Sequence, residues 1–315
     1  MRSPENVLKS LSEKAKNKEY RYERLYRNLY NPEFYLLAYQ NIATSQGSMT
    51  AGADGFTLDG MSMERIEKLI QKLRDHSYQP NPARRVYIAK KNSSKKRPLG
   101  IPSTDDKLLQ EVVRMILEAI YEPTFSDNSH GFRPKRSCHT ALKEIVTLFT
   151  GAKWIIEGDI KACFDSFDHH ITIQLLRKRI KDEAFISLMW KFLRAGYMEQ
   201  WTYHETYSGS PQGSGVSPIL ANIYLNELDR HVEELQKVFE APSKVYLTHE
   251  YTLAASRLGK LRAKINRAQG EERDRLIAKH RELRKALLKI PAKSHTDKRI
   301  CYVRYADDFL IGVCG

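Results

Sequence analysis

The sequence predicts an α+β fold, in which helices are mixed with a few short strands. Several segments repeat apolar residues at three- and four-residue spacing, the pattern of a helix with one buried face. Two short apolar segments instead run into acidic residues, as strands do where they leave a core. Strands and helices do not alternate regularly, which argues against a parallel sheet built from β-α-β units.

The first half of the chain is mainly helical by this pattern. Apolar spacing predicts helix over residues 5–45, and a glycine-containing loop separates it from a second helix. Two short strands joined by a Lys-rich turn come next, and Pro102 ends the second of them. The predicted elements after residue 45 are a helix containing Met63–Leu73, strands Val86–Ile88 and Leu99–Ile101, and helices Asp105–Tyr121 and Ala141–Phe149.

The second half contains the predicted strands that end in acids. Trp154–Ile160 has the form of a buried strand, and Ile300–Tyr305 with Phe309–Val313 has the form of a hairpin. Helices are predicted between them, at Ile173–Arg194 and Pro218–Leu235. The basic stretch that follows is predicted as two more helices, broken near Gly270 and ended by Pro291.

Composition excludes several protein classes. The 315 residues are 41% hydrophobic and 10% aromatic, which argues against global disorder. No stretch approaches the ~18 apolar residues of a membrane span, and the N-terminus has no apolar run before a cleavage site. The four cysteines show no C-x-x-C spacing, so neither a disulfide framework nor a zinc finger is predicted. A reduced cytoplasmic protein without a membrane segment fits best.

The charge favours a polyanionic partner. The chain has 52 Lys and Arg against 38 Asp and Glu, a net charge of +14. No acidic residue occurs from His76 to Thr104, and the segment from Arg257 to Arg299 has fifteen basic and five acidic side chains. A solvated helical surface normally mixes its signs more evenly, so this distribution favours nucleic acid over an ordinary basic surface.

Three acids form the strongest candidate for chemistry. Asp159 ends one apolar strand, and Asp307 and Asp308 lie in the predicted hairpin, so all three can meet at the edge of one sheet. Clustered carboxylates repel one another and persist where cations neutralise them, and hard oxygen ligands suit Mg²⁺. Two such ions can activate an attacking hydroxyl and stabilise a leaving oxygen. An Asp-Asp pair alone is more often a turn or a helix cap.

Other sequence blocks decide between these readings. Together with Tyr305-Ala306-Asp307-Asp308, and in the order that the family requires, they resemble the group II intron-encoded reverse transcriptases and maturases over roughly residues 20–315. The stretch Leu36–Gly55 is similar to that family's N-terminal extension. The matching blocks are Arg97-Pro98-Leu99-Gly100-Ile101-Pro102, Ser129-His130-Gly131-Phe132-Arg133-Pro134, Gly209-Ser210-Pro211-Gln212-Gly213 and Pro218-Ile219-Leu220-Ala221-Asn222-Ile223-Tyr224-Leu225.

The resemblance implies a right-hand polymerase with an antiparallel palm sheet packed on helices. It also implies an RNA-directed DNA polymerase that uses two Mg²⁺ ions and dNTPs, with an RNA template, a DNA primer or target, and its own intron RNA as partners. The chain stops seven residues after Asp308, so we expect a thumb and a maturase domain in a longer protein. The implied divisions are a helical N-terminal extension (1–60), fingers (61–150), the first part of the palm (151–234), a basic helical insertion (235–299) and the palm metal-binding hairpin (300–315).

Catalytic and nucleotide-binding roles are carried over from the family motifs. Asp159 and Asp307 are implied as the main metal ligands, with Asp308 beside them and the carbonyl of Ile160 assisting. Phe164 falls where an aromatic ring blocks the 2′-hydroxyl of an incoming nucleotide; an ordinary core phenylalanine is the alternative. The positions implied for holding the triphosphate or the nucleotide are Lys91, Arg97, Gln212 and Gly213.

Contacts with template or RNA are implied for four basic residues. Asp165 and Asp168 are instead expected as cap or surface residues. The four candidates are Arg85, Lys95, Lys96 and Arg133.

Several alternatives stay open. A viral-type RNA-dependent RNA polymerase usually has a second acid five residues after the first, and Phe164 occupies that position. Retron and diversity-generating reverse transcriptases share the palm, but Leu36–Gly55 favours group II introns. A splicing cofactor without polymerase activity is an alternative from another class, and the intact acids argue against it. A homodimer is a further open alternative.

Overall fold

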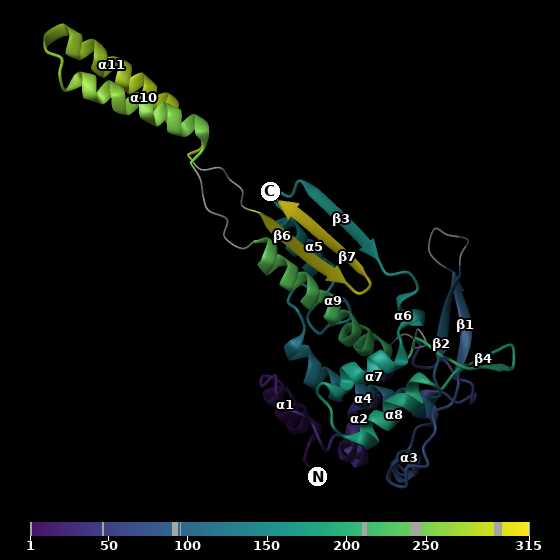
Figure 1. Cartoon of the computed structure of the whole chain (residues 1–315). Coiled ribbons are helices and arrows are strands. Elements are labelled where there is room, and N and C mark those ends of the chain that lie inside the picture. Colours follow the sequence, from purple (N-terminus) through teal and green to yellow (C-terminus); the bar gives the residue numbers. More distant parts are fainter. Residues whose placement is uncertain are drawn as a thin grey trace. The chain divides into compact units, whose positions relative to one another are not determined.

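A computed structural model describes residues 2–45, 47–89, 94, 96–209, 213–240, 247–292 and 298–314. The chain is a mixture of helices and short strands, as the sequence predicts (Figure 1). It divides into two compact units. The first contains Met1–Leu148, Glu157–Val232 and Tyr302–Leu310; the second contains Phe149–Ile156, Glu233–Cys301 and Ile311–Gly315.

Helices make up most of the first unit, and α4 lies in its core. The α4 side chains Leu109, Val112 and Ile116 are completely buried, and α4 packs against α1 and α2. Ser103 caps α4 by accepting a hydrogen bond from the backbone N–H of Asp106. The α-helices up to residue 239 are α1 (Pro4–Ala15), α2 (Pro32–Ala43), α3 (Met63–Arg74), α4 (Thr104–Tyr121), α5 (Cys138–Leu148), α6 (Cys163–Ser166), α7 (His169–Arg177), α8 (Glu183–Leu193) and α9 (Ser217–Phe239); short 3₁₀ helices are η1 (Tyr26–Tyr30), η2 (Leu58–Gly60) and η3 (Glu122–Thr124).

Two predicted helices are each divided in the structure. The helix predicted over residues 5–45 is wrong as one element, because α1 ends at Ala15 and α2 begins at Pro32 with Asn31 as its cap. Proline fits the first position of a helix but not its interior. The helix predicted over Ile173–Arg194 divides into α7 and α8, since the Asp182 carboxylate accepts from the Phe185 N–H and starts a new helix.

A four-stranded mixed sheet has the strand order β2-β1-β4-β5. Its strands are β1 (Ala83–Ala89), β2 (Lys96–Ile101), β4 (Tyr197–Glu199) and β5 (Thr202–His204). β1 pairs antiparallel with β2 and parallel with β4, and β4 pairs antiparallel with β5. The sequence predicts β1 and β2 but not the β4–β5 hairpin, because three-residue strands are too short to produce an alternating pattern.

A second sheet has three strands in the order β3-β7-β6: β3 (Trp154–Asp159), β7 (Asp308–Cys314) and β6 (Arg299–Tyr305). All three are predicted, but the expectation that β3 is buried is wrong. Trp154, Ile155 and Ile156 are 71%, 63% and 53% exposed. β3 is an edge strand, and no element within the described residues covers these three side chains.

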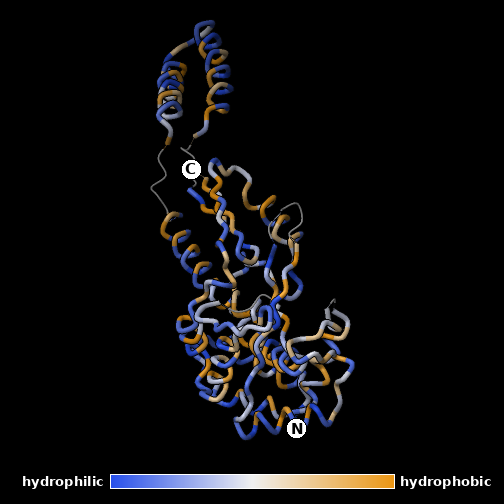
Figure 2. Tube along the Cα trace, turned by 90° about the vertical axis from the view of Figure 1, so that its right-hand side faces the viewer, coloured by the Kyte–Doolittle hydropathy of each residue, from blue (hydrophilic) through white to orange (hydrophobic). Residues whose placement is uncertain are grey.

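The basic segment of the second unit folds as a pair of helices, as predicted. α10 (His249–Ile265) and α11 (Gly270–Leu287) pack against each other. Figure 2 shows both as largely hydrophilic, with apolar residues at intervals. Within this pair, Leu261 of α10 is buried. In the described part of the chain, no helix has the length and apolarity that crossing a membrane would require.

Candidate active site

The candidate active site is built on the tight turn between β6 and β7. β6 ends at Tyr305 and β7 begins at Asp308, so Ala306 and Asp307 form the connection. Ala306 has a φ of 56°, the left-handed region that costs energy for a residue with a Cβ. Gly131 allows this turn to approach, because a Cβ there would lie 2.2 Å from the Ala306 nitrogen. Asp307 is half-buried and Asp308 is exposed.

The end of β3 lies beside this turn. Asp159 is the last residue of β3, and the next residue, Ile160, donates its backbone N–H to the carbonyl of Asp307 with an N···O distance of 3.3 Å. Gly158 packs against Phe309 of β7 so closely that a Cβ would lie 2.1 Å from the ring. The chain segments that carry Asp159 and Asp307 are therefore in direct contact, as the sequence predicts for two acids at one sheet edge.

The electrostatics of this edge are those of crowded negative charge. The pKa of Asp308 is raised by partial burial first, and then by the charges of Asp307, Asp159 and Glu157. The pKa of the Cys163 thiol is raised to about 11, by burial first and then by the nearby carboxylates of Asp307 and Asp159. The charges of Asp307 and Asp159 thus raise the pKa of both Cys163 and Asp308, so the two acids belong to one electrostatic environment.

This donor set suits a hard divalent cation. Carboxylate and carbonyl oxygens are the ligands that Mg²⁺ prefers, and a cation would relieve the repulsion that raises the pKa of Asp308. Among the described residues, no three His, Cys, Asp or Glu side chains are already grouped closely enough to hold a metal ion. The residues therefore have the oxygen atoms and the negative charge that suit the cation, but they do not form a closed set of ligands around one position.

Comparison with known proteins identifies the family. The family model for reverse transcriptase (RNA-dependent DNA polymerase) matches residues 88–247, about half of the chain, a range that contains β3 and Asp159. The chain belongs to the reverse transcriptase family. Asp307 and Asp308 lie beyond the matched range, after the α10–α11 pair.

Individual relatives extend the similarity to nearly the whole chain. The group II intron-encoded protein LtrA of Lactococcus lactis subsp. cremoris is 52% identical over 93% of this chain and 49% of its own length. The 91 kDa protein in the cob intron of Schizosaccharomyces pombe is 44% identical over 98% of this chain and 38% of its own. A solved partial Cas6-RT-Cas1–Cas2 complex matches with a TM-score of 0.48 at 19% identity, over 92% of this chain and 38% of that one. Since the matched part makes up 49% of LtrA, the chain spans about half the length of that relative.

Phe164 lies on α6, directly after the buried Cys163. Its half-buried ring makes edge contacts with Phe132 at 5.9 Å and Phe167 at 6.0 Å between centroids. Phe132 comes from the Ser129–Pro134 block, so that block meets α6 at the Phe164 ring. Edge-to-face contacts are a favourable arrangement of aromatic rings, so the Phe164 ring is supported by two neighbours.

At Gly213 the block 209–213 contacts the block 97–102. The Gly213 φ of 104° is a left-handed conformation, and a Cβ would lie 2.5 Å from the carbonyl oxygen of Gly100 on β2. The residues after it are fastened to α4, because the Gln110 side-chain oxygen accepts from Ser214 Oγ and from the Gly215 N–H, both at 3.0 Å. Gln212, predicted beside Gly213, lies outside the described residues.

The predicted basic contacts differ in their surroundings. Arg97 and Lys96 are exposed on β2, opposite Ile88 and Ala89 of β1. The Arg85 guanidinium lies 3.7 Å from the Tyr197 ring centroid and 3.9 Å from a Glu199 oxygen, so it is engaged within the sheet. Lys91 and Lys95 lie outside the described residues.

Arg133 is buried, and its guanidinium is occupied by the protein itself. It pairs with Glu122 and donates to the carbonyl of Ser129 at 2.7 Å. This geometry favours a role in holding the loop after η3, and a contact with template remains a prediction. The expected cap role of Asp168 is confirmed, since its carboxylate accepts from the Ile171 N–H at the start of α7.

Sequence reasoning missed a buried ion pair beside the candidate metal ligands. Arg304 of β6 and Asp229 of α9 are both 0% exposed, with Nε and Oδ1 2.7 Å apart. The signal was present, because a single arginine interrupts the apolar run Cys301–Tyr305. A charge inside such a strand has to be paired, so it points to a partner elsewhere in the chain.

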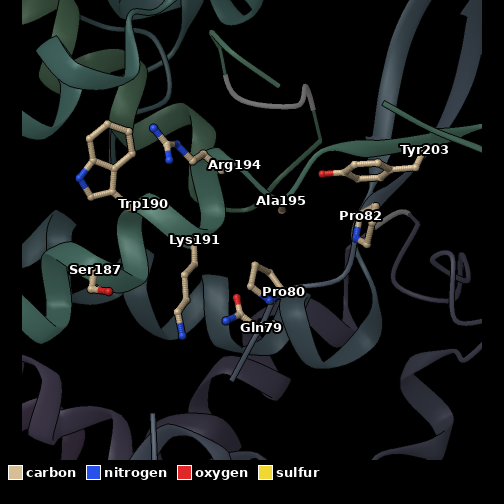
Figure 3. Close-up of a pocket in the computed structure, with 9 residues that line it drawn as sticks. All are labelled: Gln79, Pro80, Pro82, Ser187, Trp190, Lys191, Arg194, Ala195 and Tyr203. Atoms are coloured by element: carbon tan, nitrogen blue, oxygen red, sulfur yellow. The ribbon is translucent and has the colours of Figure 1, made fainter. Parts of the chain in front are cut away.

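A cavity of about 520 Å³ lies elsewhere in the first unit (Figure 3). It contains none of the predicted site residues. Arg194 stacks 4.7 Å from the Trp190 ring centroid, and Lys191 donates to the carbonyls of His76 and Tyr78, so its cations already have partners. Its lining is Gln79, Pro80, Pro82, Ser187, Trp190, Lys191, Arg194, Ala195 and Tyr203.

Proposed function

We propose that the full-length protein is the RNA-directed DNA polymerase of a group II intron. One observation carries this proposal: in a chain of the reverse transcriptase family, the end of β3 with Asp159 is hydrogen-bonded to the turn that contains Asp307. Two-metal nucleotidyl transfer requires carboxylates that share metal ions, and adjoining chain segments that each carry an acid can supply them. The similarity to LtrA, which is named as a group II intron-encoded protein, supports the intron assignment.

In this proposal Asp159 and Asp307 hold two Mg²⁺ ions, with Asp308 and the carbonyl of Ile160 assisting. Lewis-acid activation of the primer 3′-hydroxyl and stabilisation of the leaving pyrophosphate are the chemistry that two Mg²⁺ ions would supply when held by these residues. Phe164 limits the space beside the sugar of the incoming dNTP. Arg97, together with Lys91, binds the triphosphate, and Gln212 with Gly213 allows close approach of the nucleotide.

The proposed divisions of the chain follow the family order. Residues 1–60 form the N-terminal extension, 61–150 the fingers, and 151–234 with 300–315 the palm, while residues 235–299 are an insertion. The protein acts in the cytoplasm, where it meets its intron RNA, an RNA template and a DNA primer or target.

A maturase role is the second proposed function. Intron RNA binding would help the RNA reach its splicing-competent fold, and reverse transcription would then serve retrohoming. The observation that favours it is the α10–α11 pair, which is strongly basic and whose α11 has no buried residue among those described. A surface of this kind, with little part in a core, suits phosphate contact.

Primer extension on an RNA template tests the polymerase proposal. The full-length protein should extend a DNA primer with dNTPs and Mg²⁺, and a version with Asp307→Ala and Asp308→Ala should lose extension by at least about 10³-fold. Asp165→Asn is the matched control, because Asp165 is exposed and stands outside the proposed metal ligands. Equal extension by the wild-type and the double variant would refute the assignment.

A further inference from the structure

Arg304 stands three residues before Asp307, at the end of β6 that leads into the catalytic turn. Its guanidinium grips the Asp229 carboxylate of α9 with two parallel bonds: Nε to Oδ1 and Nη2 to Oδ2, both 2.7 Å. Both side chains are fully buried, and the Tyr302 hydroxyl donates to the same Oδ1 at 2.7 Å. This is the two-pronged geometry in which arginine and carboxylate bind most strongly.

The remaining donors of Arg304 reach the turn and the Ser129–Pro134 block. Nη1 donates to the carbonyl oxygen of Ala306 at 2.7 Å and to Asn222 Oδ1 at 3.3 Å, and Nη2 also donates to Ser129 Oγ at 2.8 Å. A guanidinium has five N–H groups, and all five have a partner here. Asn222 in turn donates to the carbonyl of Gly131 at 2.9 Å.

Backbone hydrogen bonds also hold the end of β6, at Arg304 itself. The Arg304 N–H donates to the carbonyl of Asn128 at 2.8 Å, and the His130 N–H donates to the carbonyl of Arg304 at 2.9 Å. Three parts of the chain therefore converge on one arginine: α9, the loop at residues 128–131, and the turn itself.

The bond to Ala306 has the most direct consequence for the candidate site. The Ala306 carbonyl belongs to the peptide that continues into Asp307, so fixing this carbonyl fixes the peptide plane next to the Asp307 Cα. Ala306 itself has the unfavourable φ of 56°, a conformation that persists only when its surroundings impose it. Arg304 supplies a buried, charged donor at this point.

We propose that the Arg304–Asp229 pair is a positioning device, which sets the orientation of the Ala306–Asp307 peptide and thereby aims the Asp307 carboxylate at the metal ions. This inference rests on the proposed polymerase function. Stability alone would not account for the pair, because two packed apolar side chains often stabilise a fold as much as a buried ion pair does. Apolar side chains could not hold the Ala306 carbonyl.

The direct test is Arg304→Lys in the full-length protein. Lysine keeps the charge but offers three donors from one nitrogen, so it cannot hold Asp229 and the Ala306 carbonyl in the same way. Residues that orient metal ligands typically change metal affinity or activity by about 10- to 100-fold when replaced. We expect a loss in that range in the rate of single-nucleotide incorporation, with an unchanged affinity for primer–template.

The decisive readout does not depend on turnover. Mn²⁺ binding without nucleotide, followed by the loss of the free-ion electron paramagnetic resonance signal, should weaken by about 10-fold or more in Arg304→Lys. Arg114→Lys is the control, because Arg114 also grips a carboxylate with two prongs, Glu111 on the same helix α4, without contacting the turn. Its Mn²⁺ binding and incorporation rate should equal those of the wild-type.

Ser129→Ala provides a second variant should Arg304→Lys fail to fold. It removes one of the five bonds and leaves the ion pair in place. A folded Ser129→Ala protein should bind Mn²⁺ measurably more weakly than the wild-type. Unchanged Mn²⁺ binding in every variant that folds would overturn the positioning role. Absence of dNTP incorporation by the wild-type protein would instead refute the proposed function, so the two failures are distinguishable.

Discussion

The backbone N–H of Ile160 donates a hydrogen bond to the carbonyl oxygen of Asp307, with N and O 3.3 Å apart. The two residues are far apart in the sequence, and between them lie the α7–α9 helices and the basic α10–α11 pair. This bond holds the residue after Asp159 against the turn that carries the acid pair. The separation of the acidic chain segments is thereby set by backbone geometry, and long flexible side chains are not required to bring them together.

The repulsion among these acids predicts that divalent cations stabilise the protein. Because the pKa of Asp308 is raised, its ionised form at neutral pH is held at a cost that a bound cation offsets. Mg²⁺ at about 100 times its dissociation constant should raise the free energy of unfolding by about 2.7 kcal/mol. Thermal unfolding at pH 7.5, with and without Mg²⁺, measures this.

Asp308→Asn separates charge repulsion from other effects of Mg²⁺. This variant should have a higher melting temperature than the wild-type without Mg²⁺, since one repelling charge is gone, and a smaller increase when Mg²⁺ is added. Asp165→Asn should behave as the wild-type in both conditions. An equal response to Mg²⁺ in all three proteins would show that the cation acts elsewhere.

Phe164→Ala is expected to relax discrimination against ribonucleotides. The ring is held by Phe132 and Phe167, and its bulk, not a hydrogen bond, would exclude the 2′-hydroxyl. Incorporation of rNTPs relative to dNTPs should rise in the full-length protein, as measured by kcat/KM for each nucleotide. Phe132→Ala should give a smaller change in the same direction, because it removes one support of the ring.

The exposed Phe56 supplies the matched control for this series. Its ring packs under Arg65 and lies apart from the Phe164 contacts, so Phe56→Ala should leave sugar selection unchanged. An unaltered dNTP preference in Phe164→Ala would mean that Phe164 is an ordinary packing residue.

Two buried histidines predict a loss of stability in mild acid. Burial lowers the pKa of His130 and of His169 below 6.5, although Glu144 beside His130 and the Gly209 carbonyl beside His169 oppose the shift. Arg133 and Arg136 lower the pKa of His130; Arg194 and His170 lower that of His169, and Asp168 raises it. In each case the unfolded chain takes up a proton at a higher pH than the folded chain does.

The sign of the pH dependence follows from that difference. Where the unfolded state binds more protons, stability rises with pH, so the free energy of unfolding should fall as the pH drops from about 7.5 through 6.5. Urea unfolding between about pH 5.5 and 8 measures this slope, above the range in which unperturbed carboxylates titrate. His169→Gln should reduce the slope, whereas substitution of the exposed His231 by Asn should not, because His231 is not among the groups that act on His130 or His169. A slope unaffected by His169→Gln would contradict the assignment.

The elements that could be predicted from the sequence are those with a long apolar periodicity or with acidic residues that mark the end of an apolar strand. The periodicity of α4 and the strand–acid–strand order of β6 and β7 are local signals, and both are present in the structure. The exposure of Trp154 on β3 could not be predicted, because an apolar run does not state whether another element covers it.

Long-range pairing accounts for the part of the site that the sequence did not reveal. Arg304 is visible as a charge within an apolar strand, but nothing local identifies Asp229, which lies in the polar part of a long helix. Gly213 was predicted from its block alone, and the reason for a glycine there is the Gly100 carbonyl on β2. Contacts of this kind depend on the completed fold.

The α10–α11 pair can be removed with little disturbance of the chain on either side. The Thr248 N–H donates to the carbonyl of Ala292 at 3.2 Å, and Thr248 Oγ1 donates to that of Pro291 at 2.7 Å, so the two ends of the pair are adjacent. A short Gly/Ser linker in place of residues 247–292 can therefore connect them. The replacement removes twelve Lys and Arg and five Asp and Glu side chains.

This replacement in the full-length protein should weaken intron RNA binding and flatten its salt dependence. Each phosphate contact contributes a slope of about −0.7 to −0.9 to the logarithm of affinity against the logarithm of salt concentration. Changing Arg273, Arg281 and Arg284 to Gln is the finer variant, because α11 has no buried residue among those described and the helix pair should persist. If the pair contacts phosphates, both variants lose slope, and the Gln variant loses less. Unchanged affinity and slope in both would mean that the helices are a solvated pair or a dimer contact, since neither depends on released counterions.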